Sequence, residues 1–206
     1  MLDLYALIIW FITVYGKIFA ILNPFSAIPI FINLTESASS EERKRVVKKA
    51  FLAMVIMVTV FTLIGIWVLE FLGISIASLR IEGGAVLFVL AMDMLGDMPR
   101  TKKLEETEIA VIPIATPLLV GPGTLTTIIV LTAENPSLQG YALILLASLA
   151  AVTTAAIILR YSLLLAKILS KSFIKALARF MSLIIAATAV ELIRMGINEW
   201  IAELTK

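Results

Sequence analysis

The chain has 206 residues, of which 61% are hydrophobic and 16% are charged, and its mean hydropathy is +1.05. Soluble domains average about 45–50% apolar and about 25% charged residues, so this composition excludes an ordinary soluble domain and indicates an integral membrane protein. The net charge of +2 favours no partner, and the absence of cysteine excludes disulfides and thiolate chemistry. Histidine, the commonest proton carrier and metal ligand, is also absent. We therefore expect no enzyme, no metal and no cofactor.

Six stretches are long and apolar enough to cross a membrane, which takes about 20 residues. The first stretch lacks the basic segment and the small-residue cleavage site of a signal peptide, so we interpret it as a retained span. It is longer than one simple crossing requires, so either it is strongly tilted or it is not one helix. The spans predict an all-α protein with a single membrane domain over residues 1–206. The six stretches are residues 4–34, 50–69, 76–95, 109–132, 141–159 and 173–193.

The basic residues lie mostly on one side of this arrangement. The segments that join spans 1 and 2, 3 and 4, and 5 and 6 hold five, three and five of the 17 Lys and Arg residues, thirteen in all. Because cytoplasmic loops carry an excess of Lys and Arg, we expect both termini to lie outside the cell membrane. In the first of these segments, Ser39 and Glu42 have the spacing of a capping box, which predicts the start of the second spanning helix.

One basic segment has its cations at four-residue spacing among Leu and Ile. This pattern is typical either of a site for lipid headgroups or of the wet face of helix ends that protrude into the cytoplasm, and we favour the wet face. The residues are Lys167, Lys171, Lys175 and Arg179.

Two proline motifs indicate an internal repeat. Each motif has a polar residue before a proline and a second proline five residues later, and equivalent positions are 93 residues apart (116 minus 23). The motifs are Asn23-Pro24 with Pro29, and Thr116-Pro117 with Pro122. Two further pairs repeat less cleanly: Arg80 with Arg179, and Asp93 with Glu191. Because each half holds three spans, the second half must enter the membrane inverted. This predicts repeat A over about residues 1–98 and repeat B over about residues 109–206.

The same motifs predict discontinuous helices in spans 1 and 4. A proline costs about 3 kcal/mol and a glycine about 1 kcal/mol inside a helix, so Pro117 followed by Gly121-Pro122-Gly123 argues for a break. Membrane helices also tolerate such residues as simple kinks, which is the alternative. A true break exposes backbone groups and must face protein or a water-filled cavity. In inverted-repeat proteins, paired breaks mark a binding site near the membrane midplane.

We expect a small-ligand site at these two breaks. Free amides at a helix start favour an anion, and the carbonyls of the preceding helix end favour a cation, so the pair suits a small zwitterion such as an amino acid. The residue before each first proline, Asn23 or Thr116, is predicted to be an N-cap, with the proline at the first helical position. Gly121 and Gly123 would let the ligand approach the backbone. The predicted substrate-binding residues are Asn23, Pro24, Phe25, Ser26, Thr116, Pro117, Gly121, Gly123 and Thr124.

Ionisable residues within spans are candidates for function. Glu82 and Asp93 in the third span are the best candidates for proton coupling, and Gly83-Gly84 more simply permits close helix packing. Several other charged residues lie mostly near span ends, where a salt bridge or snorkelling toward the interface is the simpler interpretation. They are Lys17, Arg80, Arg179, Glu191 and Arg194.

The motifs NPFSAIPIF, RIEGG and TPLLVGPGT, together with six spans, resemble the MarC/SnatA family over essentially the whole chain. This resemblance implies a multi-pass membrane protein similar to transporters of small neutral amino acids, chiefly glycine and alanine, and it implies coupling to protons. The expected partners are a small neutral amino acid, protons and the lipid bilayer, and not nucleic acid; the oligomeric state stays open.

These observations predict a secondary transporter in which two three-helix units rock around a fixed midplane site. A channel could use the same breaks as a selectivity filter, so a channel and a transporter of another small solute stay open as alternatives. A membrane enzyme would need a nucleophile or an acid–base cluster at the midplane, and the spans offer none.

Overall fold

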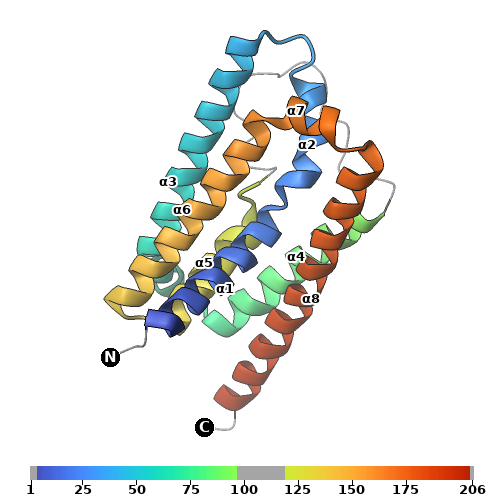
Figure 1. Cartoon of the computed structure of the whole chain (residues 1–206). Coiled ribbons are helices and arrows are strands. Elements are labelled where there is room, and N and C mark those ends of the chain that lie inside the picture. Colours follow the sequence, from blue (N-terminus) through green and yellow to red (C-terminus); the bar gives the residue numbers. More distant parts are fainter. Residues whose placement is uncertain (1–3, 97–118, 205–206) are drawn as a thin grey trace.

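The computed structural model describes residues 4–96 and 119–204, which form helices joined by short turns (Figure 1). The helices are α1 Leu4–Leu22, α2 Pro24–Leu34, α3 Ser40–Leu72, α4 Ile76–Leu95, α5 Pro122–Glu134, α6 Leu138–Arg160, α7 Ser162–Ile168 and α8 Lys171–Leu204. Within these two ranges, four segments are long and apolar enough to cross a membrane: Leu4–Ile32, Ser40–Leu72, Leu138–Arg160 and Lys171–Ala202. The predicted all-α membrane class is therefore confirmed.

The predicted spans agree with these helices in different degrees. The third span, residues 76–95, coincides with α4, which carries three charged side chains and is not among the four crossing segments. The fourth span is described only in its second part, as α5, because residues 109–118 lie outside the described ranges. At 1.5 Å per residue, the 13 residues of α5 extend about 20 Å, less than the hydrocarbon core of about 30 Å.

The start of α3 is fixed by the predicted capping box. The Ser39 hydroxyl accepts a hydrogen bond from the Glu42 N–H (3.2 Å), and the Ser39 N–H donates to the Glu42 carboxylate (2.7 Å). The helix ends at Gly73, whose φ of 67° lies in the left-handed region that favours glycine. Local sequence therefore sets both ends of this 33-residue helix.

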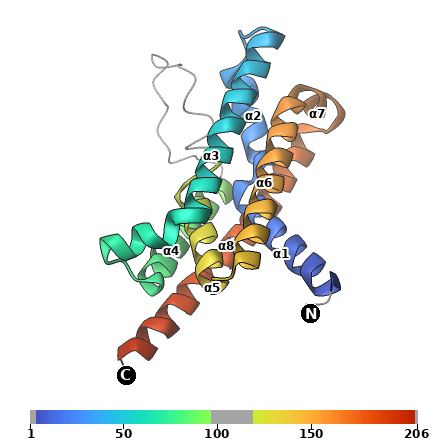
Figure 2. The same ribbon diagram turned by 90° about the vertical axis from the view of Figure 1, so that its left-hand side faces the viewer.

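Helix α5 is the most enclosed helix of the fold, since nearly all of its residues from Gly123 to Thr132 are buried. It contacts α1, α3, α4 and α6, and Figure 2 shows it behind the outer helices near the centre of the bundle. Its packing against α4 is close, because a Cβ atom on Gly83 would overlap with Thr126. A Cβ atom on Gly84 would lie 2.7 Å from the Ala189 carbonyl of α8. The expected packing role of this glycine pair is therefore confirmed.

Many of the helix contacts follow a symmetric pattern. With the offset of 93 residues, Pro122 at the start of α5 corresponds to Pro29 of α2. Exchanging α2 with α5, α3 with α6 and α4 with α8 converts the α2–α6 contact into α5–α3, and the α2–α8 contact into α5–α4; all of these contacts are present. The α3–α6 and α4–α8 contacts are unchanged by the exchange, whereas the α5–α6 contact has no comparable α2–α3 counterpart. The colours of Figure 1 show that the two members of each exchanged pair run in opposite directions.

Candidate functional site

The first span is interrupted at one buried residue, Asn23, between the end of α1 and the start of α2. Its φ of 39° is the only positive φ of a non-glycine residue in the part of the chain that the structure describes, and asparagine tolerates this region better than most residues. The Asn23 N–H donates to the Phe19 carbonyl (3.1 Å), and the Asn23 carbonyl accepts from the N–H (3.1 Å) and the hydroxyl (2.8 Å) of Ser26. The predicted break in span 1 is confirmed, as is Pro24 at the first position of the second helix.

The side chain of Asn23 does not cap α2, so the predicted N-cap role was wrong in this respect. Its Nδ2 donates to the Ala178 carbonyl of α8 (3.3 Å) and lies 3.7 Å from the Met94 sulfur of α4. Because the residue adopts the left-handed conformation that ends a helix, its amide reaches toward the neighbouring helices and not over the first turn of α2. The side chain therefore links α1, α4 and α8 at the break.

The other end of this amide, the Oδ1 atom of Asn23, is buried and has no hydrogen-bond partner among the residues that the structure describes. Leaving a buried acceptor unsatisfied costs about 1–3 kcal/mol, so a donor brought to this position is stabilised by a comparable amount. Pro24 has no N–H and the Ser26 N–H donates to the Asn23 carbonyl, so the Phe25 N–H is the nearest donor at the start of α2; N–H groups at helix starts favour anions. The break thus combines an acceptor for a cationic group with a donor for an anionic group.

Phe25 supports the break by packing. Its ring lies 6.1 Å from the Phe19 ring in an edge-to-face arrangement, so the first turn of α2 is tied to the last turns of α1. Phe19 in turn stacks on Tyr15 at 5.6 Å, and the Tyr15 hydroxyl donates to the Thr154 hydroxyl of α6 (3.2 Å). The aromatic row fixes the angle at which α2 leaves α1.

The second predicted break is described from Leu119 onward, and Thr116 and Pro117 lie outside the described residues. Helix α5 begins at Pro122, and Gly121 at its N-cap position has an extended backbone (φ −91°, ψ −176°). The buried Thr124 hydroxyl donates to the Leu119 carbonyl (3.2 Å), which holds the segment before the helix against its first turn. Helix α5 therefore starts without a side-chain cap; Pro122 is exposed and Gly121 is partly buried, and buried residues flank them on both sides.

Two glycines that sequence reasoning treated alike have different surroundings. Among the described residues, a Cβ atom on Gly121 would meet nothing within 4 Å, whereas a Cβ atom on Gly123 would overlap with Leu87 of α4. Within this part of the chain, Gly121 therefore borders open space and can admit a ligand to the backbone. The small size of Gly123 serves the packing of α5 against α4.

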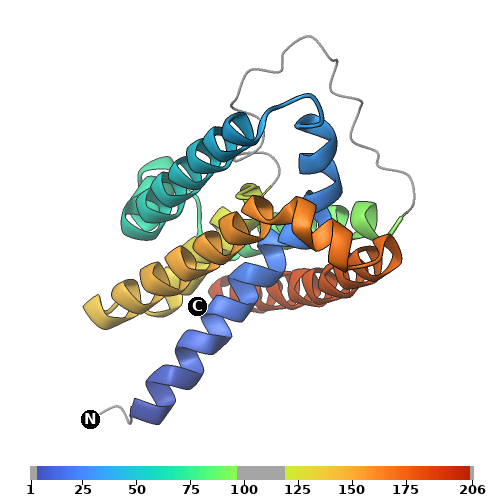
Figure 3. The same cartoon turned by 45° about the horizontal axis from the view of Figure 1, so that its top comes forward.

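The two breaks are connected through one buried cluster. Leu22, just before the first break, and Leu119 and Val120, just before Gly121, belong to the same group of buried apolar side chains. Helices α1 and α5 are in contact, and Figure 3 shows the α1–α2 junction close to the beginning of α5.

The structure separates the two proton-coupling candidates. Asp93 is partly buried and directly precedes Met94, whose sulfur contacts the Asn23 amide. Glu82 is exposed on α4 and lies eleven residues earlier, about 16 Å along the helix axis. Only Asp93 lies at the level of the break.

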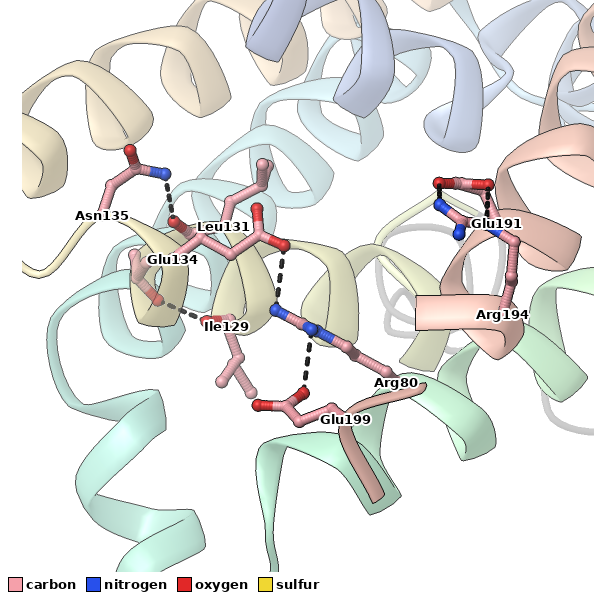
Figure 4. Close-up of polar contacts among 9 residues, drawn as sticks. Arg80, Ile129, Leu131, Glu134, Asn135, Glu191, Arg194 and Glu199 are labelled. Atoms are coloured by element: carbon pink, nitrogen blue, oxygen red, sulfur yellow. Dashed lines mark hydrogen bonds and ion pairs between the residues drawn. The ribbon is translucent and has the colours of Figure 1, made fainter. Parts of the chain in front are cut away.

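An ion-pair cluster that was not predicted from the sequence joins three helices (Figure 4). The Arg80 guanidinium of α4 binds the carboxylates of Glu134 at the end of α5 (3.0 Å) and of Glu199 in α8 (2.8 Å). The Arg80 side chain is only 12% exposed. The position of Arg80 near a span end suggested a salt bridge or snorkelling. The salt bridge is present, but its partners are 54 and 119 residues away and no local pattern identifies them.

A helical membrane protein with a spanning helix broken at a buried polar residue falls in the class of polytopic membrane proteins with discontinuous helices. The profile of the MarC family of integral membrane proteins matches residues 8–201. The chain belongs to this family, and the resemblance noted from its motifs is confirmed.

Relatives in both archaea and bacteria match over most of their length. A UPF0056 membrane protein of Methanocaldococcus jannaschii is 37% identical over 197 residues, which cover 92% of this chain and 96% of the relative. A UPF0056 membrane protein of Pyrococcus horikoshii is 34% identical and covers 91% of this chain and 94% of its own. The UPF0056 membrane protein YvbG of Bacillus subtilis is 29% identical, with 93% and 96% covered. No solved structure matches the chain.

Proposed function

We propose that the protein is a secondary transporter of small neutral amino acids such as glycine and alanine, and that it binds them between the breaks at Asn23 and Gly121. The observation that carries this proposal is the buried, unpaired Oδ1 of Asn23 beside the start of α2. The ammonium group of the substrate donates to Oδ1, and its carboxylate accepts from the Phe25 N–H at the start of α2. The open space beside Gly121 leaves room for the rest of the molecule.

The side-chain chemistry around the breaks supports a small, neutral substrate. Hydroxyl groups of Ser26 and Thr124 lie in the first turns of α2 and α5. Both hydroxyls already donate to backbone carbonyls, so their oxygen atoms remain as acceptors. No Arg, Lys, Asp or Glu occurs in the stretches 23–30 and 119–127, and a substrate with a charged side chain would therefore lack a counter-ion there.

The proposed architecture has six spans in two inverted three-helix repeats. The symmetric contacts and the opposite directions of the exchanged helices support it. The concentration of Lys and Arg in alternate segments supports a cell-membrane protein with both termini outside. Because the chain has no cysteine, single cysteines placed at Ser37 and Leu138 test this orientation: an impermeant reagent added outside cells should label only the second. Labelling at position 37 and not at position 138 would instead place both termini inside the cell.

The proposed mechanism is alternating access with proton coupling. The two repeats rock around the site at the breaks, and the broken backbone supplies contacts that stay with the substrate in both states. Asp93 is the favoured proton carrier because it neighbours the Asn23 contact, and Glu82 is the weaker candidate because it is exposed and distant.

Uptake of labelled glycine into liposomes that contain the purified protein tests this function. We expect saturable uptake that unlabelled alanine inhibits and an inward proton gradient accelerates, because substrate and proton share one cycle. An Asp93→Asn variant should lose the acceleration, whereas Glu82→Gln should keep it. Flux that does not saturate would indicate a channel, and the absence of glycine flux would reject the substrate.

A further inference from the structure

An open groove of about 300 Å³ lies between the beginning of α3 and the end of α6. In Figure 1 the two helix ends that line it lie at the end of the bundle opposite the beginning of α1 and the end of α8. Lys44, Lys48 and Arg160 line it together with the apolar side chains of Val47, Phe51 and Ala156. Its volume is at the lower end of the range of about 300–1,000 Å³ for pockets that bind small molecules.

The groove crosses from polar to apolar surface along α3. This helix has 33 residues and is about 50 Å long, about 20 Å more than the hydrocarbon core of a bilayer. All Lys and Arg residues of α3 lie before Ala50, and Phe51 begins its apolar part. The cations of the groove therefore lie at headgroup depth, and Phe51 lies at the depth where acyl chains begin.

The positive charges of the groove are only partly neutralised. Lys44 pairs with Glu41, and both side chains are exposed, by 42% and 69%. Among the described residues, neither Lys48 nor Arg160 takes part in an ion pair, although the Arg160 guanidinium lies 6.0 Å from the centre of the Tyr161 ring. Three cations from two helices thus share one carboxylate, and their mutual repulsion is relieved when an anion enters.

We propose that this groove binds an anionic glycerophospholipid of the adjoining leaflet, with its phosphate between Lys48 and Arg160 and its acyl chain along Phe51. Charge complementarity selects the headgroup, and the apolar end of the groove distinguishes a lipid from a soluble phosphate. Basic pockets between membrane helices on the cytoplasmic side bind such headgroups in other membrane proteins. The bound lipid would join α3 to α6, two spans that pack against each other.

Native mass spectrometry of the full chain in detergent, titrated with phosphatidylglycerol or with phosphatidylcholine, tests the proposal. We expect a preference for phosphatidylglycerol, which Lys48→Gln and Arg160→Gln each weaken about fivefold and the double variant about 30-fold, as follows from the contribution of each cation near a membrane surface. The matched control is Lys167→Gln with Lys171→Gln, which removes the same charge from exposed positions outside the groove. This control should keep the preference.

Three results would overturn the proposal. They are equal binding of the two lipids by the unmodified chain, an unchanged preference in the Lys48/Arg160 double variant, and an equal loss of preference in the control. Inorganic phosphate, added at the lipid concentration, should neither bind nor displace phosphatidylglycerol; displacement would assign the groove to soluble phosphate. Circular dichroism of each variant shows whether it is folded, and the two single variants suffice for the test if the double variant is not.

Discussion

At the scale of the residue, the conformation and the unpaired side-chain oxygen of Asn23 are energetically unfavourable, and the same two features suit it to bind a ligand. A non-glycine residue at φ 39° is strained by about 1–3 kcal/mol, and its unpaired Oδ1 adds a similar amount. The hydrogen bonds to Phe19, Ser26 and Ala178 hold this arrangement. Strain that persists because its surroundings fix it is a recognised property of binding sites.

The two glycines at the start of α5 give a prediction at the same scale. Gly121→Leu should abolish glycine uptake and leave the thermal unfolding temperature nearly unchanged, because the added side chain enters the open space beside the break. Gly123→Leu should destabilise the protein by about 1–3 kcal/mol or more, as overpacking does, because it overlaps with Leu87. Uptake and thermal unfolding measured on both variants check this. Normal uptake by Gly121→Leu would place the site elsewhere.

Single residues also show which features of the candidate site could be predicted from the sequence and which could not. The Asn23-Pro24 pair predicted the break, because proline terminates the preceding helical segment and starts the next. The direction of the Asn23 side chain was not predictable, since it depends on a single φ angle and on Ala178, 155 residues later. The different surroundings of Gly121 and Gly123 likewise arise from a tertiary contact with α4.

At the scale of the element, Arg80 holds the ends of α5 and α8 to α4 (Figure 4). With the proposed orientation, this cluster lies on the outer side of the membrane. Its rupture is required before α5 can move away from α4 and α8 there. The cluster is therefore a candidate outer closure of the substrate site.

Removing a carboxylate from this cluster should lower the stability of the protein more than removing one from an exposed ion pair does. Fully buried pairs lose about 3–5 kcal/mol when one partner is removed, and exposed pairs are worth about 0.2–1 kcal/mol. Because Glu134 and Glu199 are about one-third exposed, we expect each Glu→Gln variant to cost about 1–2 kcal/mol in thermal unfolding. The control Glu191→Gln breaks the exposed pair with Arg194 and should cost less than about 0.5 kcal/mol. Equal losses of stability in the Glu134, Glu199 and Glu191 variants would contradict this prediction.

Elements were more predictable than sites. The bounds of α4 and the start of α3 followed from apolar length and from the Ser39–Glu42 capping box, which are local signals. The burial of α5 on all sides and the partners of Arg80 followed from packing between distant segments. The groove proposed to bind lipid was likewise not predictable from local sequence, because its cations come from two helices, α3 and α6.

At the scale of the whole molecule, the fold encloses one short helix, α5, among longer ones, and the break between α1 and α2 lies beside its start. The symmetric contacts relate α5 to α2. Sequence offsets between the proline motifs suggested this relationship, whereas the meeting of the two breaks in one buried cluster required the assembled bundle. The central claim is that a substrate amino group is held there by Asn23.

Glycine counterflow tests this claim most directly. Liposomes that contain the protein and are loaded with unlabelled glycine should transiently accumulate labelled glycine. Asn23→Gly keeps the left-handed backbone and removes the amide, so its KM should rise about 10- to 100-fold, the effect of losing a hydrogen bond to a charged group. Asn135→Gly, at the other end of α5, is the matched control and should behave as the unmodified chain does. Counterflow by Asn23→Gly with an unchanged KM would contradict the account.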